Sequence, residues 1–189
     1  MKTIQFRAAV ALLALPVLFC GCATVSSIFG QGTPDYSSVP ADALNAAAQQ
    51  IEKAVKEGNR ELVLANQDGL NLDAPEITQA VRTRAARAEL VSKLLSSGFA
   101  VEQKNGLISI LRSREYKKAT TSNERDRNAL VVMSENANRW TIYEGTVRLS
   151  NLSPKSLSTV QDAFYKARVE LLVSGQKFQD DAGETVVKP

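Results

Sequence analysis

Two cysteines near the N-terminus have the most reactive side chains in this sequence. The segment Leu18-Phe19-Cys20-Gly21-Cys22 places a small residue directly before a cysteine, as bacterial lipoprotein processing requires. We therefore expect cleavage after Gly21 and attachment of diacylglycerol to the sulfur of Cys22. A disulfide between Cys20 and Cys22 would close a strained ring, because one residue separates them.

The residues before Cys22 are typical of a signal peptide. Lys2 and Arg7 supply positive charge, and residues 8–19 form an apolar run that is too short to span a bilayer. A lipid on Cys22 would hold the mature chain on the periplasmic face of a membrane, and Ala23 at the next position favours the outer membrane. Two alternatives stay open: release of a soluble chain by ordinary signal peptidase, or an uncleaved segment that acts as a weak anchor.

The rest of the sequence offers few catalytic side chains. It has no histidine, and Cys22 would be the only cysteine after processing. Cys–His and Ser–His–Asp catalysis, histidine or thiolate metal sites and disulfides are therefore excluded, and we expect no cofactor and no metal. Paired carboxylates could still act on an envelope glycan, although no spacing marks two that face each other. The candidates are Glu102, Glu115, Glu124 and Glu135.

The charge balance argues against a nucleic-acid partner. The formal net charge of +3 falls to about +1 without the two cations of the signal peptide, so no long-range field attracts phosphates. Arg82, Arg84 and Arg87 share the middle of one predicted helix and admit two interpretations, an anionic-ligand site or a solvated face. The nearby Glu76 and Glu89 favour the solvated face.

Apolar periodicity and turn residues predict the elements that would position these side chains. The expected fold is α+β and mostly α, with about four helices and a small antiparallel sheet made of two short hairpins. The helices are expected at 40–57, at 74–97, from near Thr121 onward with a bend or an early end at Gly145, and at 154–174, and the hairpins at 99–111 and 176–188. Residues 112–121 are expected to form a loop. Asp73 with Glu76 and Thr121 with Glu124 have the spacing of capping boxes.

The same patterns divide the chain into four parts. Residues 1–21 are the signal peptide, 22–39 the lipidated N-terminus with a flexible tether, 40–72 an N-terminal helical extension, and 74–189 the main domain. In the extension, an apolar stripe would pack on the main domain, and the opposite face would be solvated. That face carries Gln49, Glu52, Lys53 and Lys56.

The main domain resembles the YdbL-like family of small cell-envelope proteins. The likeness rests on the order of a helix ending in glycine, the segment Val101-Glu102-Gln103-Lys104-Asn105-Gly106-Leu107, Glu124-Arg125 at a helix start, and a closing Gly175-Gln176-Lys177 before a terminal hairpin. It covers about residues 74–189. The resemblance implies a periplasmic accessory or escort role, found with envelope proteins implicated in lipid traffic, and it implies no catalysis.

These observations lead to an expected function as a membrane-anchored, non-enzymatic binding, escort or assembly factor with an envelope protein as partner. A sheet edge that accepts a partner strand is one possible mechanism, and an internally covered edge is the other interpretation. The residues of the expected partner-binding edge are Val101, Glu102, Gly106, Leu107 and Ile108. The alternatives are the carboxylate enzyme and a carrier of an apolar ligand, which would need an interior cavity.

Overall fold

The computed structural model describes residues 33–189. The predicted signal peptide, the lipidation site Cys22 and most of the predicted tether lie outside the described residues. The described part is mostly helical with a small four-stranded sheet, so the predicted α+β class is confirmed. Its elements are the 3-10 turn η2 (Tyr36–Ser38), α1 (Ala41–Lys56), α2 (Pro75–Ser96), β1 (Ala100–Glu102), β2 (Ile108–Ile110), α3 (Arg114–Ala119), α4 (Ser122–Leu149), the 3-10 turn η3 (Pro154–Ser156), α5 (Leu157–Leu171), β3 (Lys177–Gln179) and β4 (Thr185–Val187).

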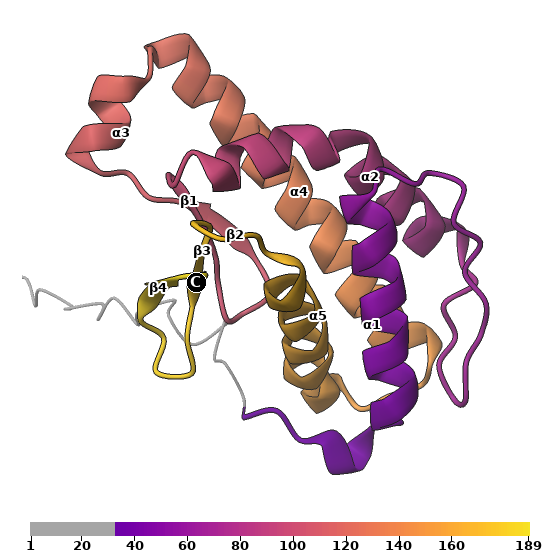
Figure 1. Ribbon diagram of the computed structural model, residues 1–189. Coiled ribbons are helices and arrows are strands. Elements are labelled where there is room, and N and C mark those ends of the chain that lie inside the picture. The colour runs from indigo at the N-terminus through magenta and orange to yellow at the C-terminus, as the bar shows by residue number, and fades with distance from the viewer. Residues whose placement is uncertain (1–32) are drawn as a thin grey trace, which may run out of the picture. The chain divides into compact units, whose positions relative to one another are not determined.

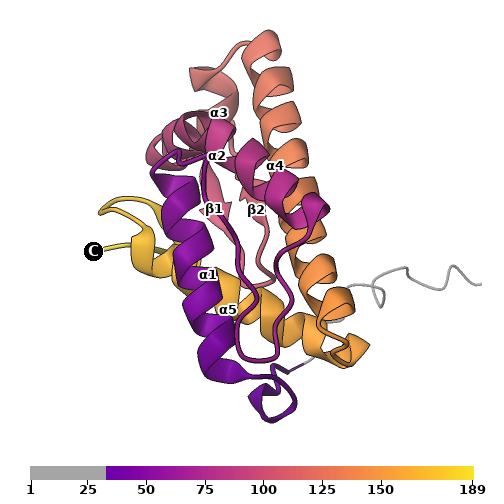
Figure 2. The same ribbon diagram turned by 90° about the vertical axis from the view of Figure 1, so that its right-hand side faces the viewer.

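Four long helices form the body of the molecule, and the sheet lies beside them (Figure 1). α1 packs against α5 and α2, while α2 also crosses the long helix α4. Both α1 and α4 lie to the right of β1 and β2 in Figure 1, and in the view turned by 90° the strands are seen between these two helices (Figure 2). The apolar core fills the space between the helices and includes Leu44 and Ile51 of α1, Ile77 of α2, Ile142 of α4 and Phe164 of α5, all fully buried.

The two predicted hairpins are present, but they join into one mixed sheet instead of an antiparallel one. The strand order is β2-β1-β3-β4. β1 and β3 run parallel, with Val101 opposite Lys177 and Glu102 opposite Phe178. β1 therefore lies inside the sheet. The turn before β2 uses Gly106, whose φ of +80° lies in the left-handed region that glycine adopts most readily.

Residues 112–121, predicted as a loop, contain the short helix α3. The Ser113 side chain accepts a hydrogen bond from the Tyr116 N–H at 3.1 Å and so caps its first turn. Tyr116 is 3% exposed, and its ring packs on Phe99 with 5.3 Å between ring centroids. One buried aromatic residue thus holds α3 on the body, although the rest of the segment is polar.

The two predicted capping boxes have different outcomes. The Thr121–Glu124 box is present, and the Thr121 N–H donates to Glu124 Oε2 at 2.7 Å. At α2, Ala74 occupies the N-cap instead of Asp73, and no side-chain cap bond forms among the described residues. Glu76 instead pairs with Arg148 of α4, 2.8 Å between Oε1 and Nη2. The prediction of a capping box at Asp73 was wrong because the helix begins one residue later.

The N-terminal helical extension is part of the main body. Leu44, Ala48 and Ile51 of α1 are fully buried, and they belong to the same apolar core as the buried residues of α2, α4 and α5. The end of the predicted tether also differs from expectation, since Tyr36 in η2 donates to Asp162 Oδ2 of α5 at 2.7 Å and lies under the Lys166 ammonium. Residues 35–38 are therefore docked on α5.

Candidate functional site

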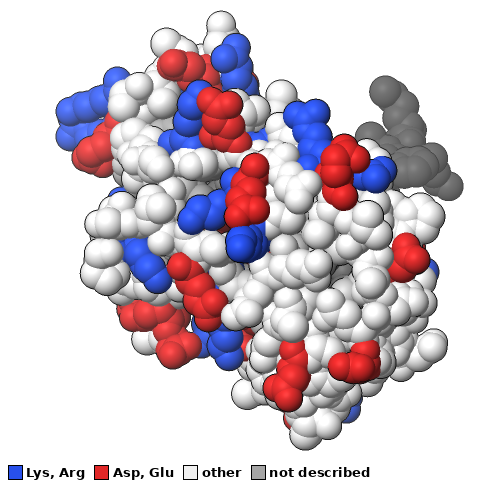
Figure 3. All heavy atoms as spheres, turned by 45° about the vertical axis from the view of Figure 1, so that its right-hand side comes forward, with Lys and Arg blue, Asp and Glu red and all other residues white. Residues whose placement is uncertain are grey.

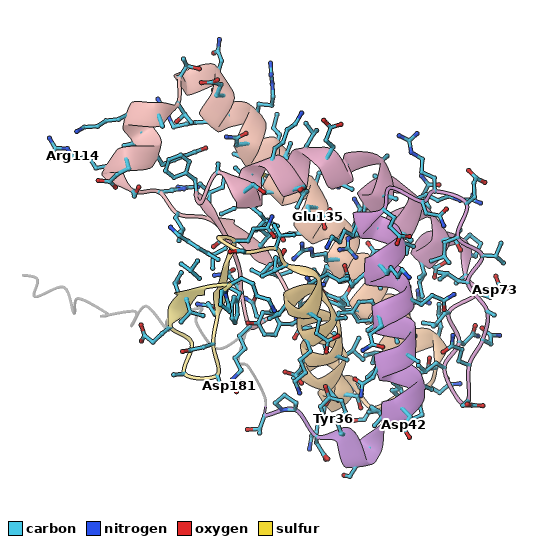
Figure 4. All side chains as sticks on the ribbon, in the orientation of Figure 1. Tyr36, Asp42, Asp73, Arg114, Glu135 and Asp181 are labelled. Carbon is cyan, nitrogen blue, oxygen red and sulfur yellow. The ribbon has the colours of Figure 1, made fainter. Side chains whose placement is uncertain are left out.

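Charged side chains that are almost completely buried meet where α1, α2, α4, α5 and β1 converge. Six of them are at most 6% exposed: Glu52, Arg84, Glu102, Glu135, Arg139 and Arg168. Arg87 of α2, 13% exposed, joins them at the margin through Glu135. We call these seven residues the ion cluster. In Figure 4 the labelled Glu135 lies within the helical body, whereas Arg114 projects outward from α3.

On the α2 side of the ion cluster, one arginine joins two glutamates. Arg84 donates to both carboxylate oxygens of Glu52, at 3.0 and 2.7 Å, and through Nε to Glu135 Oε1 at 2.8 Å. Glu135 also accepts from Arg87 at 3.3 Å. The bidentate contact with Glu52 fixes the angle of both side chains, as guanidinium–carboxylate pairs do.

Two further arginines complete a closed ring of alternating charge. Arg139 binds Glu135 through Nε at 2.8 Å and both oxygens of Glu102 at 2.6 and 2.8 Å. Arg168 then binds Glu102 Oε2 at 3.1 Å and Glu52 Oε1 at 2.7 Å. Each ring glutamate is therefore held between two ring arginines. We call these six residues the ion ring. It runs Glu52, Arg84, Glu135, Arg139, Glu102, Arg168 and back to Glu52.

Helical spacing and one glycine place these side chains. Glu135 and Arg139 are four residues apart on α4 and so lie on the same face. The Gly106 carbonyl accepts from Arg168 Nη2 at 2.8 Å and from the Tyr143 hydroxyl at 2.7 Å. A Cβ at position 106 would lie 3.1 Å from that hydroxyl oxygen, so a side chain there would push against Tyr143.

The arginines of the ion cluster keep Glu52 and Glu135 ionised at neutral pH. Burial opposes ionisation of Glu135, but Arg84 and Arg139 outweigh it and lower the pKa of this carboxyl to about 2. Burial likewise opposes ionisation of Glu52, and Arg84 and Arg168 hold its pKa below the usual value. The pKa of the Arg84 guanidinium is raised by Glu52 and Glu135 against the effect of burial.

A pocket of about 200 Å³ lies over the ion cluster, between α1, α2 and the end of α5. Its inner end is the ion ring, because all six ring residues line it. Its walls are apolar and come from Val55, Ala88, Val91, Leu95, Leu171 and Leu172. Lining residues that are exposed, Lys56, Ser92 and Val173, mark its opening. The Lys56 ammonium donates to the Leu171 carbonyl at 2.6 Å and so bridges α1 and the end of α5 at the opening.

The four carboxylates predicted as catalytic candidates separate into two pairs. Glu102 and Glu135 both line the pocket and are joined through Arg139. Glu115 and Glu124 lie on the exposed surface of α3 and at the start of α4. The structure therefore brings Glu102 and Glu135 together, a pair that the sequence did not distinguish from the other candidate carboxylates.

The predicted partner-binding edge is not a free edge. Val101 and Glu102 belong to the inner strand β1, and Glu102 is part of the ion ring. β2 is an edge strand, but its Ile108 is buried and both backbone groups bind the Asn136 side chain of α4, each at 2.9 Å. The prediction of a free edge was wrong because the Asn136 amide covers β2. It presents a donor and an acceptor to the Ile108 backbone, as a neighbouring strand would.

Gly106 and Leu107, the remaining residues of the predicted edge, also make contacts inside the protein. The Gly106 carbonyl is bound by the ion ring as described, and the partly buried Leu107 packs against the apolar core. The other edge of the sheet is β4, whose Thr185 and Val187 are exposed.

Four ring residues were assigned to solvated faces or not singled out from the sequence. Glu52 was placed on the polar face of its helix, Arg84 was interpreted as solvated, and Arg139 and Arg168 were not considered. A signal exists for each, because a buried core residue lies four positions away: Ala48 for Glu52, Ala80 for Arg84, Tyr143 for Arg139 and Phe164 for Arg168. A charge at helical spacing from buried residues points inward, and four such charges of both signs can satisfy one another.

Neither a metal-binding cluster nor a membrane-spanning helix is present within residues 33–189. Residues 33–189 contain no group of three or more carboxylate or thiol side chains arranged to hold a metal ion. Among the helices of this region, none is both long enough and apolar enough to cross a membrane. On the face drawn in Figure 3, positive and negative side chains are interspersed.

Comparison with known proteins gives no match: no family model, no curated protein and no solved structure is similar to this chain. The YdbL-like resemblance stays a prediction that rests on the sequence motifs quoted above.

Proposed function

We propose that this protein is a non-enzymatic binding protein held at the cell envelope by lipid on Cys22, and that the pocket over the ion cluster is its binding site. The observation that carries the proposal is a pocket with apolar walls and a charged, internally paired inner end. Such a combination of apolar surface and a few fixed polar groups is typical of small-ligand sites. The pocket also offers the space that a carrier of an apolar ligand would need.

Binding is a better use of this site than carboxylate catalysis. A glycosidase needs one carboxylic acid whose pKa is raised so that it can donate a proton near neutral pH. The pKa of Glu135 is lowered to about 2, and that of Glu52 is also lowered. Each ring glutamate is fixed by two arginines, so proton release or nucleophilic attack would have to break the ring.

The location and partners follow from the sequence. The lipoprotein motif at Leu18–Cys22 supports attachment to a membrane, with the outer membrane favoured by Ala23. The YdbL-like resemblance supports an escort or assembly role beside an envelope protein, accessory to lipid transport. A pocket for a small apolar group is compatible with that role, because an escort protein must hold and release its ligand without changing it.

Filling the pocket tests the binding proposal. The probe is octan-1-ol, followed by saturation-transfer NMR with the purified full-length chain. Ala88→Leu adds a larger side chain to the pocket wall, and Ala86→Leu, on the exposed face of the same helix, is the matched control. We expect transfer to the parent and to the control and its loss in Ala88→Leu. Equal transfer to all three chains would contradict the proposal.

Labelled fatty acid tests the anchor separately. Cells that express the chain with Cys22→Ser should incorporate no label into it, whereas Cys20→Ser should be labelled like the parent. Undiminished labelling of Cys22→Ser would show that this cysteine is not the lipidated residue.

A further inference from the structure

The ion cluster carries one positive charge that its own carboxylates do not balance. It contains four guanidiniums, those of Arg84, Arg87, Arg139 and Arg168, against three carboxylates. The pocket lining adds a second unbalanced cation, the exposed Lys56, because its three ring arginines and three ring glutamates balance one another. Both excess charges lie at the margin of the balanced ring, and the positive potential that they create over the pocket favours an anionic ligand.

Two of the arginines retain hydrogen-bonding capacity toward such an anion. Each guanidinium has five N–H groups. Within residues 33–189, Arg84 uses three of them, on Glu52 and Glu135. Arg168 likewise uses three, on Glu102, Glu52 and the Gly106 carbonyl. Both side chains line the pocket, and the two guanidiniums meet at Glu52 Oε1.

The size of the pocket limits the rest of the ligand. A volume of about 200 Å³ corresponds to about seven groups of water size, at about 30 Å³ each. The walls between the ion ring and the opening are aliphatic, which favours a short hydrocarbon chain over a sugar or a peptide.

We propose that the pocket binds a small amphiphilic carboxylate, with its carboxylate at Arg84 and Arg168 and a chain of about six to eight carbons along Val55, Ala88 and Leu95. This inference rests on the proposed function and adds the chemical class of the ligand. The chain end reaches the opening beside Lys56, where a longer hydrocarbon can continue into solvent or toward a partner.

The test compares three probes of equal chain length with the purified full-length chain by titration calorimetry. Octanoate is the proposed ligand class, octan-1-ol lacks its charge, and octylammonium reverses it. We expect octanoate to bind at least about tenfold more tightly than octan-1-ol, because a charge-assisted hydrogen bond exceeds a neutral one by about that factor. Octylammonium should bind more weakly than either. Equal binding of octanoate and octan-1-ol would overturn the proposal.

A charge-removing variant makes the test specific to the excess charge. Arg87→Gln removes one of the two excess charges at the margin of the cluster without opening the ion ring, and Arg82→Gln removes an exposed charge from the same helix as the control. Octanoate affinity should fall toward that of octan-1-ol in Arg87→Gln and stay unchanged in Arg82→Gln. A parallel fall in both variants would attribute the effect to general charge.

Failure of this inference can be told apart from failure of the proposed function. If octanoate and octan-1-ol bind equally and Ala88→Leu abolishes both, the pocket is a binding site but its ligand is not a carboxylate. If neither probe binds the parent chain, the ligand class and the pocket's role are both wrong.

Discussion

Nη1 of Arg168 on α5 lies 2.7 Å from Oε1 of Glu52 on α1, and the two side chains are 6% and 2% exposed. This contact joins residues that are 116 positions apart. It closes the ion ring and makes the first helix part of the wall of the pocket. The N-terminal extension therefore shapes the candidate site instead of lying beside it.

Breaking the ring at this contact should destabilise the fold. Glu52→Gln leaves Arg84 and Arg168 without their shared carboxylate, and loss of one partner from a buried ion pair costs about 3–5 kcal/mol. Glu57→Gln, at the exposed end of the same helix, is the matched control and should change the free energy of unfolding by less than about 0.5 kcal/mol. Urea unfolding measures both. Similar small losses in the two variants would mean that the ring does not contribute to stability.

The ion cluster also predicts the direction of acid unfolding. The pKa of Glu135 is lowered from 4.5 to about 2 in the folded chain, so its ionisation stabilises the fold above the unfolded-state pKa. That contribution is lost as the pH falls from about 4.5 toward 2. The free energy of unfolding of the parent should therefore fall over this window.

The variant Glu135→Gln isolates this contribution. It should be less stable than the parent at pH 7, and the difference should shrink as the pH falls toward 2, since Glu135 becomes increasingly protonated there. Unfolding by urea at several pH values gives the comparison. A difference that does not depend on pH would contradict the assigned ionisation.

Asn136 is expected to protect the edge of the sheet. Asn136→Ala removes both hydrogen bonds to the Ile108 backbone, and unsatisfied buried backbone groups cost about 1–3 kcal/mol. Asn138→Ala, which loses one bond to Ser134 within the same helix, should cost less than about 1 kcal/mol. Sedimentation should also show more self-association of Asn136→Ala, because the uncovered strand can pair with another chain. Two variants of equal stability and oligomeric state would refute this role.

Helix capping gives a prediction on which sequence and structure disagree. Thr121→Ala removes a capping box and should cost about 1 kcal/mol. Asp73→Ala should be nearly neutral, since Ala74 occupies the N-cap of α2. Thermal unfolding of the two variants separates the alternatives. A larger loss in Asp73→Ala would favour the capping box that the sequence suggested.

Local patterns predicted the helices well, because their signals lie within each segment. The stripe of Leu44, Ala48 and Ile51 and the glycines that follow α1, α2 and α5 are visible without tertiary information. Gly145, in contrast, lies inside α4, which continues to Leu149. The parallel pairing of Val101 with Lys177 is not, since no turn connects those strands. The same holds for α3, which depends on one distant aromatic contact between Tyr116 and Phe99.

The candidate site was harder to predict for an electrostatic reason. A single buried charge is so unfavourable that Arg84 or Glu52, considered alone, is best assigned to solvent. Burial becomes acceptable only when charges of opposite sign from several elements meet, and that meeting is a property of the fold. Glu102 and Glu135 were singled out as carboxylates, but their arginine partners decide what they can do.

Chemical-shift mapping is the most direct test of the central claim that the pocket over the ion cluster is a ligand-binding site. Octanoate is added to the isotope-labelled full-length chain, and the backbone amide resonances are followed. The account predicts shifts concentrated at Val55, Ala88, Ser92, Leu172 and Val173, which line the pocket, and none at the exposed strand β4. Shifts confined to other surfaces, or no shifts at saturating octanoate, would contradict it.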